Sequence, residues 1–182
     1  MSDKKTPWRV LVINPGSTST KVGVFEGDEC KLSKNVAHDA KDLAQFDGVS
    51  AQMPYRCDLI LGALGEAGLK LEDFDAFVGR GGGLLSLPGG TYAINEVMLE
   101  HARIGANGIR HPAQLGPQIA HEFAVKCGKP AFVVNPPDTD ELCDLARMTG
   151  IKGVYRNVHL HALNLKETAI RHAAKLGRAY DE

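Results

Sequence analysis

The chain has 182 residues, of which 43% are hydrophobic, so it is long enough to bury a core in one or two small domains. Its 21 Lys and Arg residues against 22 Asp and Glu residues leave a net charge of −1, which excludes a general attraction to nucleic acid or to an anionic membrane. The four cysteines lie far apart and form no C-x-x-C pair, which argues against a zinc site and predicts free thiols in a reducing compartment.

Residues 1–8 form a polar tail without the apolar segment of a signal peptide, and no run approaches the length of a membrane span. We therefore expect a cytoplasmic protein that has no membrane partner. Residues 8–13 are nearly all apolar, as in a strand covered on both faces. Residues 21–26 and 30–36 are predicted to extend this strand into an antiparallel three-stranded meander, with a glycine turn at Gly27.

The loop between the first two predicted strands reads N-P-G-S-T-S-T-K and is rich in groups that bind phosphate. It offers a glycine that exposes backbone amides, several hydroxyl donors and a cation: Gly16, Ser17, Thr18, Ser19, Thr20 and Lys21. It is not a Walker A loop, because G-x-x-x-x-G-K-[ST] occurs nowhere in the chain and a strand follows the loop instead of a helix. The alternative is a Ser/Thr-rich surface turn without a ligand.

Helices and strands are predicted to alternate in the remainder of the chain, after an ambiguous polar stretch at 39–48. A D-x-x-E capping box at 138–141 predicts a helix that begins at Asp138 as its N-cap. The loop at 81–90, which follows Arg80, shows neither a helical nor a strand period. The other predicted elements are helices around 59–64, 96–106, 112–127 and 161–176, and strands at 75–79 and 131–135.

Several separated motifs, in one order along the chain, resemble the butyrate kinases, a branch of the acetokinase family. The first loop is similar to the phosphate hairpin of the superfamily of acetate and sugar kinases, Hsp70 and actin. The other motifs are G-R-G-G-G-L-L at 79–85, P-G-G-T-Y at 88–92, H-P-A-Q-L-G at 111–116 and H-A-L-N at 161–164. The resemblance implies an α/β fold, a ribonuclease-H-like (actin-like ATPase) domain over residues 9–182, with a mixed sheet flanked by helices. Because family members are roughly twice as long, it also implies that the second domain is missing or only begun.

The resemblance further implies a carboxylate kinase that uses ATP and Mg²⁺ to convert butyrate to butyryl phosphate and ADP, reversibly, and that is a possible homo-oligomer. A half-length chain is expected to have little or no activity alone, because the nucleotide of such kinases lies between two domains. Two alternatives stay open. One is a kinase for acetate, propionate or a branched-chain acid, and the other is a non-catalytic, phosphate-binding remnant.

Phosphoryl transfer to a carboxylate brings two anions together, so cations and hydrogen-bond donors matter more than a general base. Arg80 is predicted to hold the carboxylate or the transferring group, while Gly81 and Gly82 allow close approach. The resemblance implies that His161 donates to a phosphoryl oxygen and that His111 contacts the phosphoryl group or the substrate. A surface arginine and solvated histidines are the alternatives.

Asn14 is predicted to bind a phosphate oxygen or a magnesium-bound water, or else to cap the Pro15-Gly16 turn. The family generally has an aspartate where this chain has Asn135, which removes a negative charge from the expected metal neighbourhood. Asp140 is the candidate that replaces it. If the prediction of a kinase is right, Asn14, Arg80 and His161 converge on one cleft.

Overall fold

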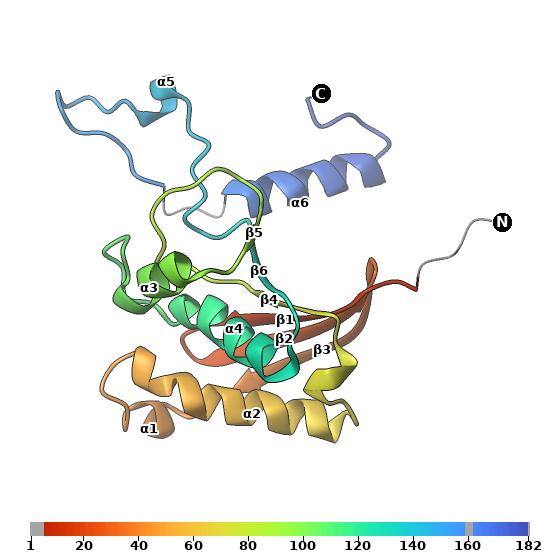
Figure 1. Ribbon diagram of the computed structural model, residues 1–182. Coiled ribbons are helices and arrows are strands. Elements are labelled where there is room, and N and C mark those ends of the chain that lie inside the picture. Colours follow the sequence, from red (N-terminus) through yellow and green to blue (C-terminus); the bar gives the residue numbers. More distant parts are fainter. Residues whose placement is uncertain (1–5, 159–161, 182) are drawn as a thin grey trace.

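A computed structural model describes residues 6–158 and 162–181, and its centre is one six-stranded mixed sheet (Figure 1). The strand order is β3-β2-β1-β4-β6-β5. The strands are β1 (Arg9–Pro15), β2 (Ser19–Glu26), β3 (Glu29–Ala37), β4 (Ala76–Gly79), β5 (Thr91–Ala93) and β6 (Ala131–Val134). A mixed sheet with flanking helices confirms the predicted fold class. Within the described part of the chain, no helix is long and apolar enough to cross a membrane.

The first three strands form the predicted antiparallel meander. Apolar side chains that point to one face of β1 and β2 are buried, because the alternation of a strand places every second residue on that face. The register pairs Asn14 of β1 with Lys21 of β2. The candidate phosphate loop is therefore the tight connection of a β-hairpin, as the sequence predicted.

Three strands run parallel in the middle of the sheet, with β1 beside β4 and β4 beside β6. Their carboxyl ends consequently lie along one edge. The short strand β5 was not predicted, because three residues that directly follow a glycine pair carry no readable period. β5 lies at the edge of the sheet and is formed by its antiparallel hydrogen bonding to β6, which its own sequence does not predict.

Two helices, α2 (Met53–Glu66) and α4 (Leu115–Cys127), cover one face of the sheet and form the main core with it. Phe77 of β4 lies at the centre of this core, edge-on to Phe74 and to Phe123 of α4, with ring centroids 5.9 and 6.3 Å apart. The other helical elements between β3 and β6 are α1 (Ala40–Leu43), α3 (Glu96–Ile104) and the 3₁₀ turns η1 (Ser50–Gln52), η2 (Leu71–Asp73) and η3 (Pro112–Gln114).

The predicted helix at residue 138 is wrong. The chain from 138 to 143 is irregular, and the short helix α5 (Asp144–Arg147) begins only after Cys143. The carboxylate of Asp138 is buried and accepts a hydrogen bond from Asn107, so it does not cap a helix. The last helix, α6 (Ala162–Lys175), agrees with its prediction and lies across the sheet from α2 (Figure 1).

A close backbone contact joins the end of β4 to the start of α4. A Cβ atom built on Gly79 would lie 2.2 Å from the carbonyl oxygen of Gly116, and one built on Gly116 would lie 2.5 Å from the carbonyl oxygen of Arg80. Neither position has room for a methyl group, and both obstacles are backbone atoms that cannot rotate away. The contact therefore fixes the point at which Arg80 leaves the sheet.

We expect Gly79→Ala to lower the free energy of unfolding by about 2–3 kcal/mol, because the added methyl group must push β4 and α4 apart. Gly62→Ala is the matched control, because a Cβ there meets nothing within 4 Å on an exposed helical position. That control should gain up to about 1 kcal/mol from helix propensity. Urea denaturation followed by circular dichroism measures both, and equal stabilities of the two variants would contradict the contact.

Candidate functional site

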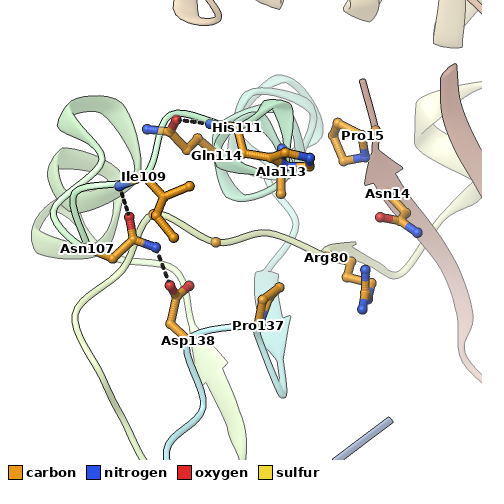
Figure 2. Close-up of a pocket in the computed structure, with 13 residues that line it drawn as sticks. Asn14, Pro15, Arg80, Asn107, Ile109, His111, Ala113, Gln114, Pro137 and Asp138 are labelled. Atoms are coloured by element: carbon orange, nitrogen blue, oxygen red, sulfur yellow. Dashed lines mark hydrogen bonds between the residues drawn. The ribbon is translucent and has the colours of Figure 1, made fainter. Parts of the chain in front are cut away.

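A cavity of about 380 Å³ opens where the parallel strands end, the usual place for a ligand in an open α/β sheet (Figure 2). Three segments reach it: the β1–β2 turn, the chain after β4 and the chain after β6. The segment between α3 and α4 closes its remaining side. Its lining residues are Asn14, Pro15, Gly16, Arg80, Gly82, Gly83, Asn107, Ile109, His111, Ala113, Gln114, Pro137 and Asp138.

Asn14 and Arg80 lie next to each other because their strands are in parallel register. Ile13 pairs with Gly79, and the backbone N–H of Arg80 donates to the Ile13 carbonyl over 2.8 Å. Asn14, still within β1, and Arg80, the first residue after β4, are thus the next pair in this register (Figure 2). Burial lowers the pKa of the half-buried Arg80 guanidinium, but from a usual value so high that the group stays charged at neutral pH.

Asp138 supplies a carboxylate to the opposite wall. Its side chain is only 3% exposed, and its Oδ1 accepts from Asn107 Nδ2 over 2.6 Å. Asn107 Oδ1 in turn accepts from the backbone N–H of Ile109, which orients the amide toward the carboxylate (Figure 2). The cavity therefore has a guanidinium group at one side and a carboxyl group at the other.

His111 is the N-cap of η3 and lines the cavity. Its Nδ1 accepts from the backbone N–H of Ala113 over 3.1 Å, which in the neutral ring leaves Nε2 as the protonated nitrogen. Its own N–H donates to Gln114 Oε1, and Gln114 Nε2 donates to the Ala102 carbonyl. The buried Gln114 thus holds the histidine segment against α3.

Five of the predicted site residues line this cavity: Asn14, Gly16, Arg80, Gly82 and His111. Six others do not. Ser17, Thr18, Ser19 and Lys21 belong to the turn and to β2, Gly81 packs against Pro117, and Asp140 lies further along the chain. His161 lies outside the described residues, so the structure shows only Asn14 and Arg80 of the predicted convergence.

Asp140 makes a two-point ion pair with Arg147, with both N–O distances 2.7 Å. This hydrogen bonding lowers the pKa of the carboxyl group. Both Asp140 oxygens are therefore engaged by a guanidinium that ties α5 to the preceding segment. Among the described residues, no group of three or more His, Cys, Asp or Glu side chains is placed to hold a metal ion.

Asn135 has a left-handed backbone with φ of 40°, a conformation that asparagine tolerates better than most residues. Its Oδ1 accepts from the backbone N–H of Gly90, and its own N–H donates to the Gly90 carbonyl, over 2.8 and 3.0 Å. The side chain is thus occupied in fixing the P-G-G loop to the end of β6.

Asn107 and Gln114 were not predicted from the sequence, and Asp138 was predicted as a helix cap. The one signal in the sequence was the pair of glycines, Gly105 and Gly108, that flank residues 106–107 and favour a turn. In the structure both glycines have positive φ. Nothing in the local pattern indicated that this turn meets the segment after β6, because the contact joins residues 31 positions apart.

The fold of the chain is that of one half of the acetate-kinase structures. It matches the acetate kinase of Porphyromonas gingivalis with a TM-score of 0.58 at 17% identity, covering 95% of this chain and 50% of that one. A propionate kinase from Francisella tularensis gives a TM-score of 0.53 at 16% identity, with 93% and 49% covered. At these identities the likeness concerns the fold.

Sequence comparison identifies the chain as a homologue of the butyrate kinases. It is 38% identical over 175 residues to Butyrate kinase 1 of Clostridium acetobutylicum and 43% identical over 174 residues to a probable butyrate kinase of Phocaeicola vulgatus. Each alignment covers 96% of this chain, but 49% and 48% of the relative. The chain thus spans about half the length of the curated relatives it matches. No protein-family model matches it.

One buried titratable group lies behind the β1–β2 turn. His38 is 6% exposed, its Nε2 is 2.8 Å from Thr20 Oγ1, and burial together with the nearby charge of Arg56 lowers its pKa to about 4. Its Nδ1 is buried without a hydrogen-bond partner among the described residues. The ring is therefore neutral in the folded protein at neutral pH.

Stability should fall as the pH is lowered from 6.5 towards 4, because the unfolded chain protonates His38 first. Between pH 6.5 and 4.5 we expect a loss of at most about 2 kcal/mol. Glu66 and Asp140, whose pKa values are lowered by their cationic partners, titrate below this window. His38→Gln should flatten the pH dependence in thermal melts, and an unchanged slope would contradict the assignment.

Proposed function

We propose that this chain forms the phosphoryl-acceptor half of a carboxylate kinase that transfers the γ-phosphoryl group of ATP to butyrate. The observation that carries the proposal is the cavity at the strand ends, where Arg80, Asn14 and the turn at Gly16 meet. Homology to butyrate kinases over 96% of the chain supports the reaction class. The relatives are about twice as long as this chain. ATP binding by a two-domain protein is therefore itself part of the proposal.

In this proposal Arg80 holds the substrate carboxylate, or the group being transferred, by its planar guanidinium. The carboxylate is already ionised at neutral pH, so the site supplies no general base. Asn14 and the protonated Nε2 of His111 donate hydrogen bonds to the phosphoryl oxygens, and His161 is proposed as a further donor. The turn residues Gly16 to Ser19 and Lys21 contribute backbone amides, hydroxyls and a cation on the phosphate side.

Mg²⁺ accompanies ATP in this proposal, and the cavity has oxygen groups that suit it. Mg²⁺ prefers hard oxygen ligands and needs only one or two protein carboxylates, because water and phosphate oxygens complete its shell. Asp138 is the carboxylate that lines the cavity, and Asn14 is placed to contact a metal-bound water. When bound, the ion neutralises charge on the phosphates. We propose Asp138 for this role because it lines the cavity, which Asp140 does not.

Two other functions remain candidates. Acetate, propionate or a branched-chain acid would use the same groups, since one methylene changes selectivity by only about 1–3 kcal/mol. A non-catalytic phosphate-binding remnant is supported by the amide of Asn135 and by the half-length match.

A chimera tests the proposed reaction. Residues 1–182 replace the aligned half of Butyrate kinase 1 from Clostridium acetobutylicum, and acyl phosphate is trapped with hydroxylamine. We expect ATP-dependent product from butyrate with the chimera and none with the 182-residue chain alone. Arg80→Lys should lower kcat/KM by about 100-fold, because the two-point contact is lost. The control Arg9→Lys, at the opposite end of β1, should change it less than twofold.

A folded chimera that produces no acyl phosphate from any short-chain acid would favour the remnant. Full activity of the Arg80→Lys variant would remove Arg80 from the proposed mechanism. A panel of acetate, propionate, butyrate and isobutyrate ranks the substrate alternatives in the same assay.

The proposal that Asp138 binds Mg²⁺ predicts a large effect of one substitution in the chimera and a small effect of another. Asp138→Asn should raise the Mg²⁺ concentration needed for half-maximal rate by at least about tenfold, because a charged oxygen ligand is lost. Asn135→Asp, whose side chain is held by Gly90 outside the cavity lining, should change it less than threefold. A strong gain from Asn135→Asp with no effect of Asp138→Asn would assign the metal to position 135 instead.

A further inference from the structure

Arg56 is the largest completely buried side chain of the described protein, at 0% exposure. It rises from the first turn of α2 to the back of the β1–β2 turn and does not line the cavity. Its Nη1 donates to the carbonyl oxygen of Gly16 over 2.9 Å and to Thr20 Oγ1 over 3.0 Å. The guanidinium is thus on the inner side of the same turn whose outer side meets the cavity.

The partners of Arg56 are all neutral. Besides Gly16 and Thr20, Gln52 Oε1 accepts from both Nε and Nη2, over 3.1 and 2.9 Å. Among the described residues, no Asp or Glu oxygen lies within ion-pair distance of this guanidinium. The adjacent His38 is neutral and brings no compensating negative charge.

A buried cation without a counter-charge costs free energy, and replacing such groups by apolar ones is often neutral or stabilising. The core therefore gains little from this charge as such. A negative group bound on the cavity side of Gly16 would be attracted through a poorly screened region, where Coulomb interactions are several times stronger than in water. The buried charge of Arg56 is therefore favourable only when an anion is bound at the turn.

We propose that Arg56 is a positioning residue for the phosphate turn, which fixes the Gly16 carbonyl and supplies from behind the positive charge that a bound phosphate group requires. This inference rests on the proposed function, because it assigns the turn to phosphate. Thr20 is the second anchor, since its hydroxyl joins the guanidinium to His38.

The test variant neutralises the charge of the Arg56 guanidinium while the side chain stays in place. In Gln52→Glu, a carboxylate of nearly the same shape takes over the two hydrogen bonds from Arg56. Backbone amides of Gly16, Ser17, Thr18 and Ser19 are followed by NMR in the 182-residue chain during titration with inorganic phosphate. We expect a higher melting temperature for Gln52→Glu together with about tenfold weaker phosphate affinity.

Gln45→Glu is the matched control, because it makes the same change in net charge at an exposed position near α1. It should leave the phosphate affinity within twofold. Arg56→Met removes the charge by a second route and should also weaken phosphate binding, and if it does not fold, Gln52→Glu decides alone.

The outcomes separate the two proposals. If the wild-type turn binds phosphate and Gln52→Glu binds it equally well, the role of Arg56 is wrong and the proposed function stands. If the wild-type turn amides do not respond to phosphate at all, the proposed function loses its phosphate site and the inference falls with it. A stabilised Gln52→Glu variant with weakened binding supports both, because a purely structural arginine would change stability alone.

Discussion

The parallel register between β1 and β4 is the constraint on which the candidate site depends. Pairing Ile13 with Gly79, and donating the Arg80 N–H to the Ile13 carbonyl, makes Asn14 and Arg80 neighbours at the sheet edge. A slip of one residue would turn every β4 side chain to the opposite face. Burial of Phe77 against Phe74 and Phe123 opposes that slip, because the slip would take the ring out of both contacts. The hydrophobic core thus determines where the polar groups of the cavity meet.

Charge in this region is arranged in layers. A buried guanidinium lies behind the β1–β2 turn, a half-buried one stands beside it at Arg80, and the carboxylate of Asp138 closes the far wall. The positive groups come from α2 and from the chain after β4, whereas the negative one comes from the chain after β6. An anionic ligand would be attracted toward the turn.

Much of the fold was predictable because its signals are local. The apolar runs at 8–13 and 75–79 and the glycine turn at Gly27 specify strands by composition alone, and the spaced motifs gave the family resemblance. The strand β5 and the segment around Asp138 were not predictable. The capping-box pattern at Asp138 is the same whether its carboxylate caps a helix or accepts from Asn107. The choice is made by tertiary contacts with residues 31 and more positions away, which no local pattern contains.

The backbone contact between Gly79 and Gly116 has a consequence for how this protein can vary. Each glycine is excluded from change by the main chain of the other segment, whatever chemistry takes place in the cavity. A relative with a new substrate would therefore have to keep both residues while it altered Ile109, Ala113 or Pro137 around them. If such relatives keep the two glycines, this shows only that the backbone packing requires them. Whether the relatives share an activity has to be judged from other positions.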